Sequence, residues 1–189
     1  MDQNLVESMS SSKNSHWCTP PEVLDRVRKV NNIALDPCSN PMSIVDADLE
    51  IMPPQDGLTV PWLQDGGLTF VNPPYGREVK YWTAKARKEA SKGAEIILLT
   101  AARVDTRWFH EDLFSGASAI CFWKGRIKFI DPVTRKQGNP ALFPSAVVYW
   151  GDNCLGFAKA FADAGYVMYP VYWVAGRPVI SHEGEAVIV

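Results

Sequence analysis

The sequence of 189 residues lacks the patterns that mark most metal-bound, secreted and membrane-spanning domains. Its four cysteines form no CxxC pair and its three histidines have no paired ligand spacing, so we expect reduced thiols and no structural metal site. No apolar run approaches the ~20 residues that cross a bilayer, and the N-terminal residues contain no apolar core of a secretion signal. We therefore expect a soluble protein of the cytoplasm that does not associate with a membrane.

Lys and Arg are absent from one long segment of the chain. Residues 31–76 contain six acids and no basic residue, whereas residues 77–136 contain thirteen basic and seven acidic residues. The whole chain has a formal net charge of only −2, which excludes nucleic-acid binding through a bulk excess of positive charge. The two segments suit a cationic or hydroxyl-rich cofactor and a phosphate backbone respectively, but ordinary solvated surfaces would give the same pattern.

The order of the expected elements predicts an α/β fold. Residues 1–15 are polar and Ser-rich and are expected to form a disordered arm, followed by one domain over 16–189. Thr19 is expected to cap a helix over 20–30, since Pro, Pro and Glu follow it. Further helices are expected over 78–92, 106–114 and 154–164, and strands near 32–36, 44–45, 68–71, 94–100, 117–123, 126–130, 145–149 and 166–174. This alternation predicts a mostly parallel central sheet with helices on both faces.

The tetrapeptide Asn72-Pro73-Pro74-Tyr75 is the most specific local feature, and it directly follows the expected strand 68–71. Two consecutive prolines remove two N–H donors and leave carbonyl acceptors on a stiff loop. Asn72 adds a side-chain acceptor and Tyr75 a flat ring, so the loop suits a planar base with an exocyclic amine. Hydrogen bonds that draw the amine hydrogens out of plane localise the nitrogen lone pair toward an electrophile. The alternative interpretation is a Pro-Pro turn that only ends a strand.

Residues 70–76 (FVNPPYG) resemble motif IV of the S-adenosylmethionine-dependent amino-methyltransferases. Six further segments are similar, in order and spacing, to the small phage and prophage DNA N6-adenine methyltransferases. They are residues 17–20 (WCTP), 35–39 (LDPCS), 56–58 (DGL) with Trp62, 102–110 (ARVDTRWFH), 125–129 (GRIKF) and 143–145 (FPS). The similarity covers residues 15 to 150, approximately.

This resemblance implies a single Rossmann-like domain that transfers a methyl group from S-adenosylmethionine to N6 of a flipped adenine in DNA, in a bacterial host cell. It places Asn72, Pro73, Pro74 and Tyr75 at the catalytic centre. Asn72 would accept the amine hydrogen and Tyr75 would stack on the base. Phe109 or Trp108 is a weaker candidate for the opposite face of the base.

Cofactor contacts are implied along the acidic half of the chain. The candidate residues are Trp17, Thr19, Pro20, Asp36, Pro37, Cys38, Asp46, Asp48 and Asp56. Asp46 or Asp48 would bind the ribose hydroxyls and Asp56 the adenine amine of the cofactor. The glycine-rich motif I of most methyltransferases is absent, because residues 36–41 read DPCSNP.

DNA contacts are implied in the basic half. The candidates are Arg77, Lys80, Arg103, Arg107, Lys124, Arg126, Lys128 and Arg135. The segment between Asp36 and Asn72 is too short for a separate target-recognition domain, so the loop 131–139 with Arg135 and Lys136 is the candidate for base reading. We therefore expect the protein to recognise a short DNA sequence or to have weak sequence specificity.

The residues leave three alternatives open. Pro37-Cys38 invites comparison with cytosine-carbon-5 methyltransferases, which use a cysteine after proline as a nucleophile, but here the pair follows the first strand. The same NPPY chemistry serves other amines, including the N4 amine of cytosine, guanine in RNA and protein glutamine. The missing motif I glycines would also fit a DNA-binding remnant that holds no cofactor.

Overall fold

The computed structural model describes residues 17–174, 177–182 and 185–188, so the expected disordered arm over 1–15 lies outside the described residues. The elements in chain order are α2 (Pro21–Val30), β1 (Ile33–Asp36), β2 (Leu49–Glu50), β3 (Leu68–Val71), α3 (Val79–Ala90), β4 (Ile96–Ala101), the π-helix η2 (Phe109–Phe114), β5 (Ala119–Trp123), β6 (Ser145–Trp150), α4 (Cys154–Phe161), β7 (Gly165–Met168), β8 (Val171–Val174), β9 (Arg177–His182) and β10 (Glu185–Ile188). Within the described ranges, no helix is long and apolar enough to span a bilayer.

Seven strands form the main sheet, in the order β2-β1-β3-β4-β6-β5-β7. The pairs β1–β2, β1–β3 and β3–β4 are parallel, whereas β4–β6, β5–β6 and β5–β7 are antiparallel. The sheet is therefore mixed, and the predicted parallel arrangement holds for the four strands on the β2 side. Residues 124–144 join β5 to β6 without a helix, and antiparallel strands need no crossover helix.

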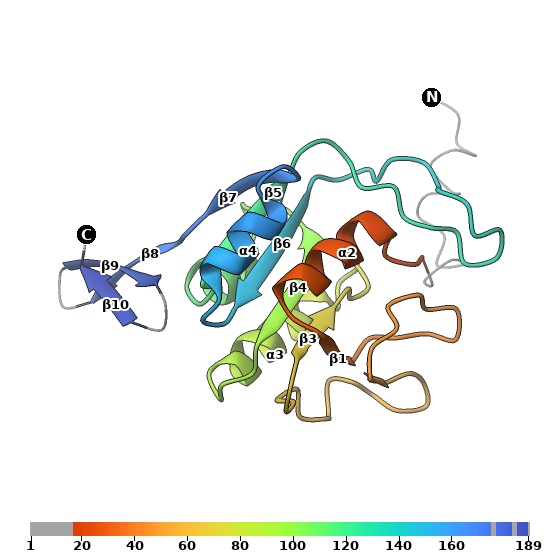
Figure 1. Cartoon of the computed structure of the whole chain (residues 1–189), viewed down its shortest axis with the longest axis horizontal. Coiled ribbons are helices and arrows are strands. Elements are labelled where there is room, and N and C mark those ends of the chain that lie inside the picture. The colour runs from red at the N-terminus through yellow and green to blue at the C-terminus, as the bar shows by residue number, and fades with distance from the viewer. Residues whose placement is uncertain (1–16, 175–176, 183–184, 189) are drawn as a thin grey trace.

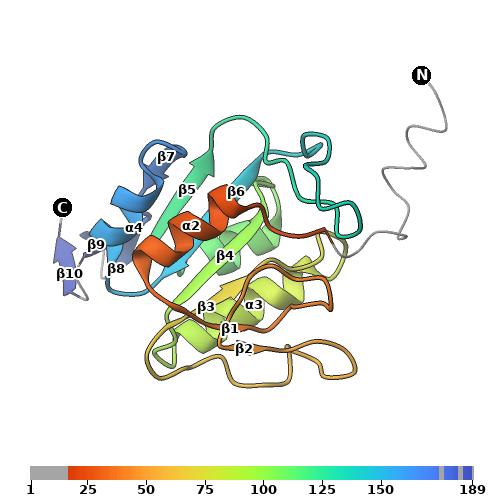
Figure 2. The ribbon, with the colours of Figure 1, turned by 45° about the vertical axis from the view of Figure 1, so that its right-hand side comes forward.

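Helices cover both faces of this sheet, as predicted. Alternate residues of β4 point to opposite faces, so Ile97 and Leu99 pack in one core cluster and Ile96 and Leu98 in the other. The first cluster includes the buried residues of α2 and α4, which contact each other, and the second includes those of α3 and η2. Figures 1 and 2 show α2 and α4 side by side on one face and α3 on the other.

Helix α2 has the predicted apolar spacing but not the predicted cap. Its four valine and leucine positions at 23, 24, 27 and 30 are buried, which fixes the helix on the sheet. The N-cap residue is Pro20, with Pro21 at the first helical position, and no side chain caps the helix. The expectation that Thr19 caps α2 is therefore wrong, and its hydroxyl is available for another contact.

Three predicted strands differ from the observed ones. Residues 44–45 form no strand, and the edge strand β2 lies a few residues later. Residues 126–130 are extended but make isolated backbone hydrogen bonds to the segment 137–141, so only Ile130 forms a bridge. The predicted strand 166–174 is divided into β7, in the main sheet, and β8, which pairs with β9 in a separate three-stranded sheet with β10.

Candidate active site

The predicted motifs meet at one edge of the main sheet. Strands β1, β3 and β4 are parallel, so Asp36, Asn72 and Arg103 lie at or just beyond neighbouring carboxyl ends. Strand β6 runs the opposite way, which brings its first residues and the preceding Phe143 to the same edge. Figures 1 and 2 show that the loops 37–48, 51–67 and 124–144 project from this side.

Asp36 and Asn72 border the point where the strand order reverses. The chain leaves β1 for β2 on one side, and β3 then pairs with β1 on the other. Open α/β sheets bind ligands in the crevice at such a point, because the loops diverge there. A cavity of about 1180 Å³ opens at this position.

The cavity joins the predicted catalytic residues to most of the predicted cofactor residues. Its lining includes the whole tetrapeptide 72–75 together with Trp17, Thr19, Asp36, Pro37, Cys38 and Asp56. Among the described residues that line it, Arg103 is the one Lys or Arg. The tetrapeptide is thus part of a cleft that continues to the end of β1.

Asn72 is held by two hydroxyl groups. Its Nδ2 donates to Oγ1 of Thr19 at 3.0 Å, and its Oδ1 accepts from the Tyr75 hydroxyl at 2.5 Å. Burial raises the pKa of Tyr75 well above its usual value, so the phenol stays neutral and keeps the proton that it donates. Asn72 Oδ1 retains a second lone pair, which is free of any described partner.

Two phenylalanines pack against Tyr75. The ring of Phe143 lies 4.9 Å from the Tyr75 ring at 80°, and the ring of Phe129 lies 6.0 Å away at 61°. All three side chains line the cavity and form an aromatic corner at its wall. Phe109, the weaker candidate for the opposite face of a base, is instead fully buried in the core beneath η2. Its neighbour Trp108 is partly buried against the same cluster, and neither residue lines the cavity.

Asp36 is a buried carboxyl group at the end of β1. It is 4% exposed, and its Oδ1 accepts from the Cys38 N–H at 2.9 Å. Burial raises the pKa of Asp36 to about 7 against the lowering effect of this hydrogen bond, and the nearby Glu50 carboxylate adds to the rise. A cation bound beside Asp36 would favour its ionised form, so this group can respond to a positively charged ligand.

Neither acid predicted for ribose lines the cavity. Asp48 lies beside the first half of β1, where it accepts from Nδ2 of Asn32, and Asp46 is exposed with a φ of 51°. The acid at the end of β2 is Glu50, the register partner of Asp36. Ser39 donates to the Glu50 carboxylate at 2.8 Å. Because β2 lies later in the chain than the expected strand at 44–45, the acid at its end is Glu50, which does not line the cavity either.

The remaining predicted cofactor residues differ in their access to the cavity. Pro20 is buried at the start of α2 and does not line the cavity. Asp56 lines it, and its carboxylate accepts from the Leu58 N–H within its own turn at 2.9 Å. Burial raises the pKa of the Cys38 thiol far above its usual value, which leaves the group protonated and a poor nucleophile.

The motif at 56–62 fixes a loop against the end of β1. The fully buried Trp62 donates from its indole nitrogen to the carbonyl of Gly57 at 2.8 Å and stacks on Trp82 of α3. Glu89 of α3, 1% exposed in its side chain, accepts from the Trp62 N–H and from Lys85 and Lys92. Burial alone would raise the pKa of Glu89, but these hydrogen bonds outweigh it and lower the pKa to about 2.

Most of the predicted DNA-binding residues lie on the surface around the cavity without lining it. Those with exposed side chains include Arg77, Lys80, Arg107, Lys124, Arg126, Lys128 and Arg135. Arg107 pairs with Glu111 at 3.3 Å, and Arg135 donates to the Met42 carbonyl at 2.8 Å. These two side chains therefore make contacts within the protein that DNA binding would have to replace.

The turn at 131–136 projects an apolar side chain. The Asp131 carboxylate accepts from the N–H groups of Val133 and Thr134, which holds the turn, and Val133 is 82% exposed. Trp17 packs so closely on Gly138 that a Cβ there would lie 2.6 Å from the indole ring. The predicted base-reading loop is thus anchored to the cavity wall at Trp17.

A scan against protein families matches the model of the DNA N-6-adenine-methyltransferase (Dam) family over residues 7–154. The chain belongs to the Dam family. Every residue that lines the cavity falls within the matched range, whereas strands β7 to β10 fall outside it. No curated protein and no solved structure matched the chain. Membership of the Dam family indicates a DNA methyltransferase.

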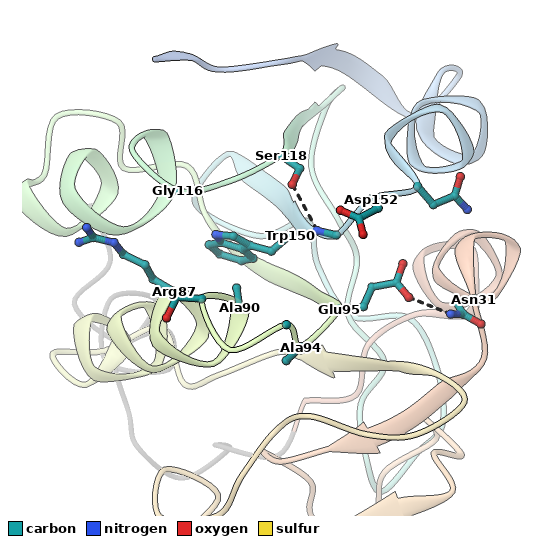
Figure 3. A pocket seen from close by; sticks show the side chains of 13 residues that line it. Asn31, Arg87, Ala90, Ala94, Glu95, Gly116, Ser118, Trp150 and Asp152 are labelled. Atoms are coloured by element: carbon teal, nitrogen blue, oxygen red, sulfur yellow. Dashed lines mark hydrogen bonds between the residues drawn. The ribbon is translucent and has the colours of Figure 1, made fainter. Parts of the chain in front are cut away.

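A second hollow, of about 540 Å³, lies at the opposite edge of the sheet (Figure 3). It is bordered by the residues before β1, β4 and β5 and by the end of β6. Glu95 there accepts from Asn31, and the Gly151 N–H donates to Ser118, so these polar groups are already paired. None of the residues that the sequence analysis assigned to a site lines this hollow. In this member of the Dam family the motifs gather only at the other edge.

Proposed function

We propose that this chain transfers a methyl group from S-adenosylmethionine to the N6 amine of adenine in DNA. The observation that carries the proposal is the shared cavity, which places the Asn72–Tyr75 corner and the buried Asp36 on one wall. Family membership supports adenine as the base, since the matched family is described by that activity. The Rossmann-like character of the domain belongs to the same proposal and is supported by the crevice between β1 and β3.

The donor set of the cavity fits S-adenosylmethionine. The cofactor carries positive charge and two ribose hydroxyls, and the lining of the cavity includes the carboxylates of Asp36 and Asp56. Asp36 would face the methionine end and Asp56 the adenine amine, and both line the cavity. When bound, the cofactor supplies an electrophilic methyl group on its sulfonium.

Asn72 and Pro73 would activate the target amine. The free lone pair of Asn72 Oδ1 and the Pro73 carbonyl accept the two amine hydrogens and draw them out of the ring plane. This would direct the nitrogen lone pair toward the methyl group that bound S-adenosylmethionine would supply, with the electron pair of the broken C–S bond left on sulfur. Neither acceptor is a strong base, so the excess proton leaves to water.

The aromatic corner would hold the flipped base. An adenine must leave the duplex before its amine can reach the cavity, and stacking offsets part of the few kcal/mol that unstacking costs. The Phe143 ring stands nearly perpendicular to the Tyr75 ring, and both side chains line the cavity that would receive the base. Arg103 lines the cavity, and the turn at 131–136 lies in the chain between the lining residues Phe129 and Asn139; both would contact the DNA.

The experiment that tests the proposal identifies the methylated base. Unmethylated plasmid DNA is incubated with the protein and S-adenosylmethionine, digested to nucleosides and analysed by mass spectrometry. We expect N6-methyladenine. N4-methylcytosine would overturn the choice of base, and no methylated nucleoside together with no heat of S-adenosylhomocysteine binding would favour the non-catalytic alternative.

A further inference from the structure

Thr19 contacts the catalytic corner rather than α2. Its side chain is 2% exposed, and its Oγ1 accepts from Asn72 Nδ2 at 3.0 Å. No side-chain cap forms at the start of α2, so the hydroxyl does not serve the helix. The contact spans 53 positions of sequence and lies on the side of Asn72 opposite to the Tyr75 contact.

The orientation of the Asn72 amide matters for the proposed reaction. The χ2 torsion of asparagine is broad and nearly two-fold, so an unsupported amide can turn its NH₂ group to where its oxygen should lie. An amide turned in this way would present a donor to an amine that is itself a donor. Two hydrogen bonds, one to each end of the amide, fix its plane, and in this arrangement Oδ1 lies on the Tyr75 side.

We propose that Thr19 is a positioning residue that holds the Asn72 amide for methyl transfer, and that it is not a cofactor ligand. The inference rests on the proposed function and adds a residue to it. Thr19 acts through Asn72 and touches neither the base nor the methyl group.

The chain around Thr19 links this contact to the loop that the sequence analysis assigned to base reading. Cys18, the preceding residue, exchanges both backbone hydrogen bonds with Ile130 at 3.0 Å. Ile130 in turn bridges to Gln137, and Trp17 packs on Gly138. The segment 17–19 therefore joins the loop 130–138 to Asn72 through described contacts.

Two substitutions separate the hydroxyl from the volume of the side chain. Thr19→Val is isosteric and lacks the hydroxyl, whereas Thr19→Ser keeps the hydroxyl and loses a methyl group. We expect Thr19→Val to lower kcat about 10-fold, the loss that one hydrogen bond in a buried site represents, with little change in the Kd for S-adenosylhomocysteine. We expect Thr19→Ser to retain kcat within about 3-fold, because the contact to Asn72 is kept.

The measurements are single-turnover methyl transfer, calorimetry with S-adenosylhomocysteine and thermal unfolding. Thr19→Ala is a second variant without the hydroxyl, used in case Thr19→Val does not fold, and it should show the same loss. Wild-type kcat in either hydroxyl-free variant would overturn the inference. A large rise in Kd with kcat intact would show instead that Thr19 binds the cofactor. Wild-type protein that does not methylate adenine would overturn the proposed function and this inference with it.

Discussion

Gly57 packs directly against the backbone of Pro37. A Cβ added at Gly57 would lie 1.7 Å from the Pro37 carbonyl oxygen and 2.7 Å from the carbonyl carbon. These are backbone atoms that cannot rotate away, so only glycine allows the loop at 56–58 to close over the end of β1. The contact joins two of the recognised motifs into one wall of the cavity.

Gly57→Ala should therefore open this wall. The overpacked loop must move away from Pro37 and lose the hydrogen bond that Trp62 donates to Gly57, and we expect a loss of about 1–3 kcal/mol in the free energy of unfolding. Gly76→Ala is the matched control, because nothing lies within 4 Å of its added Cβ. Denaturant unfolding checks both variants. Equal stability of the two alanine variants would contradict the close approach.

The raised pKa of Asp36 predicts how the stability of the protein without cofactor depends on pH. Its pKa of about 7 in the folded protein exceeds the value of about 3.9 in an unfolded chain, so the unfolded state loses its proton first as the pH rises. Protonated Asp36 therefore stabilises the folded protein fully below about pH 4. As the pH rises to about 7, this contribution is lost and the free energy of unfolding falls by up to about 4 kcal/mol.

Asp36→Asn should remove this dependence, since the amide does not titrate. Denaturant unfolding of both proteins between pH 4 and 8 measures this pH dependence. If the free energy of unfolding changed with pH in the same way in both proteins, the raised pKa of Asp36 would be contradicted. With S-adenosylmethionine present the wild-type curve should flatten at high pH, because a cation beside Asp36 favours the ionised carboxylate.

Arg103 is expected to contribute to DNA binding more than the other exposed basic residues do, because it alone among them lines the cavity. Arg103→Ala should weaken duplex binding and lower the slope of log affinity against log salt by about 1, as expected for one lost phosphate contact. Lys88→Ala, an exposed basic position in the last turn of α3, is the control and should leave both quantities unchanged. Fluorescence anisotropy at several salt concentrations gives both values. A normal slope in the Arg103 variant would exclude a phosphate contact.

Cys38 should form no covalent bond to DNA. Burial keeps its thiol protonated, and its backbone N–H, rather than its sulfur, makes the contact to Asp36. Duplex DNA that contains 5-fluorocytosine traps enzymes that attack cytosine through a cysteine. We expect no protein–DNA band on a denaturing gel with this duplex. A band that disappears in Cys38→Ser would instead support the cytosine-carbon-5 mechanism.

The sequence was sufficient to predict the strands that carry the site, since Asp36 and the tetrapeptide at 72–75 each follow a short buried run. Parallel pairing then brings both to one edge. The insertion of β6 between β4 and β5 could not be predicted, because nothing local distinguishes an antiparallel from a parallel buried strand. That insertion is what brings Phe143 beside Tyr75.

Errors at the site came from local patterns that a long-range contact overrides. Thr19 has the sequence context of an N-cap, yet its hydroxyl meets Asn72, which is distant in sequence. Phe109 lies within the motif at 102–110, but its side chain packs in the core, and β2 ends at Glu50 rather than near Val45. Each of these observed positions depends on tertiary packing, which cannot be predicted from the spacing of residues along the chain.

The most direct test of the account measures cofactor binding and methyl transfer in Asn72→Ala. The side chain makes its described contacts to Thr19 and Tyr75, so its removal should spare the carboxylates at the other end of the cavity. We predict binding of S-adenosylhomocysteine close to that of the wild-type protein and no detectable N6-methyladenine. Methyl transfer at a rate near that of the wild-type protein would contradict the claim that Asn72 holds the target amine.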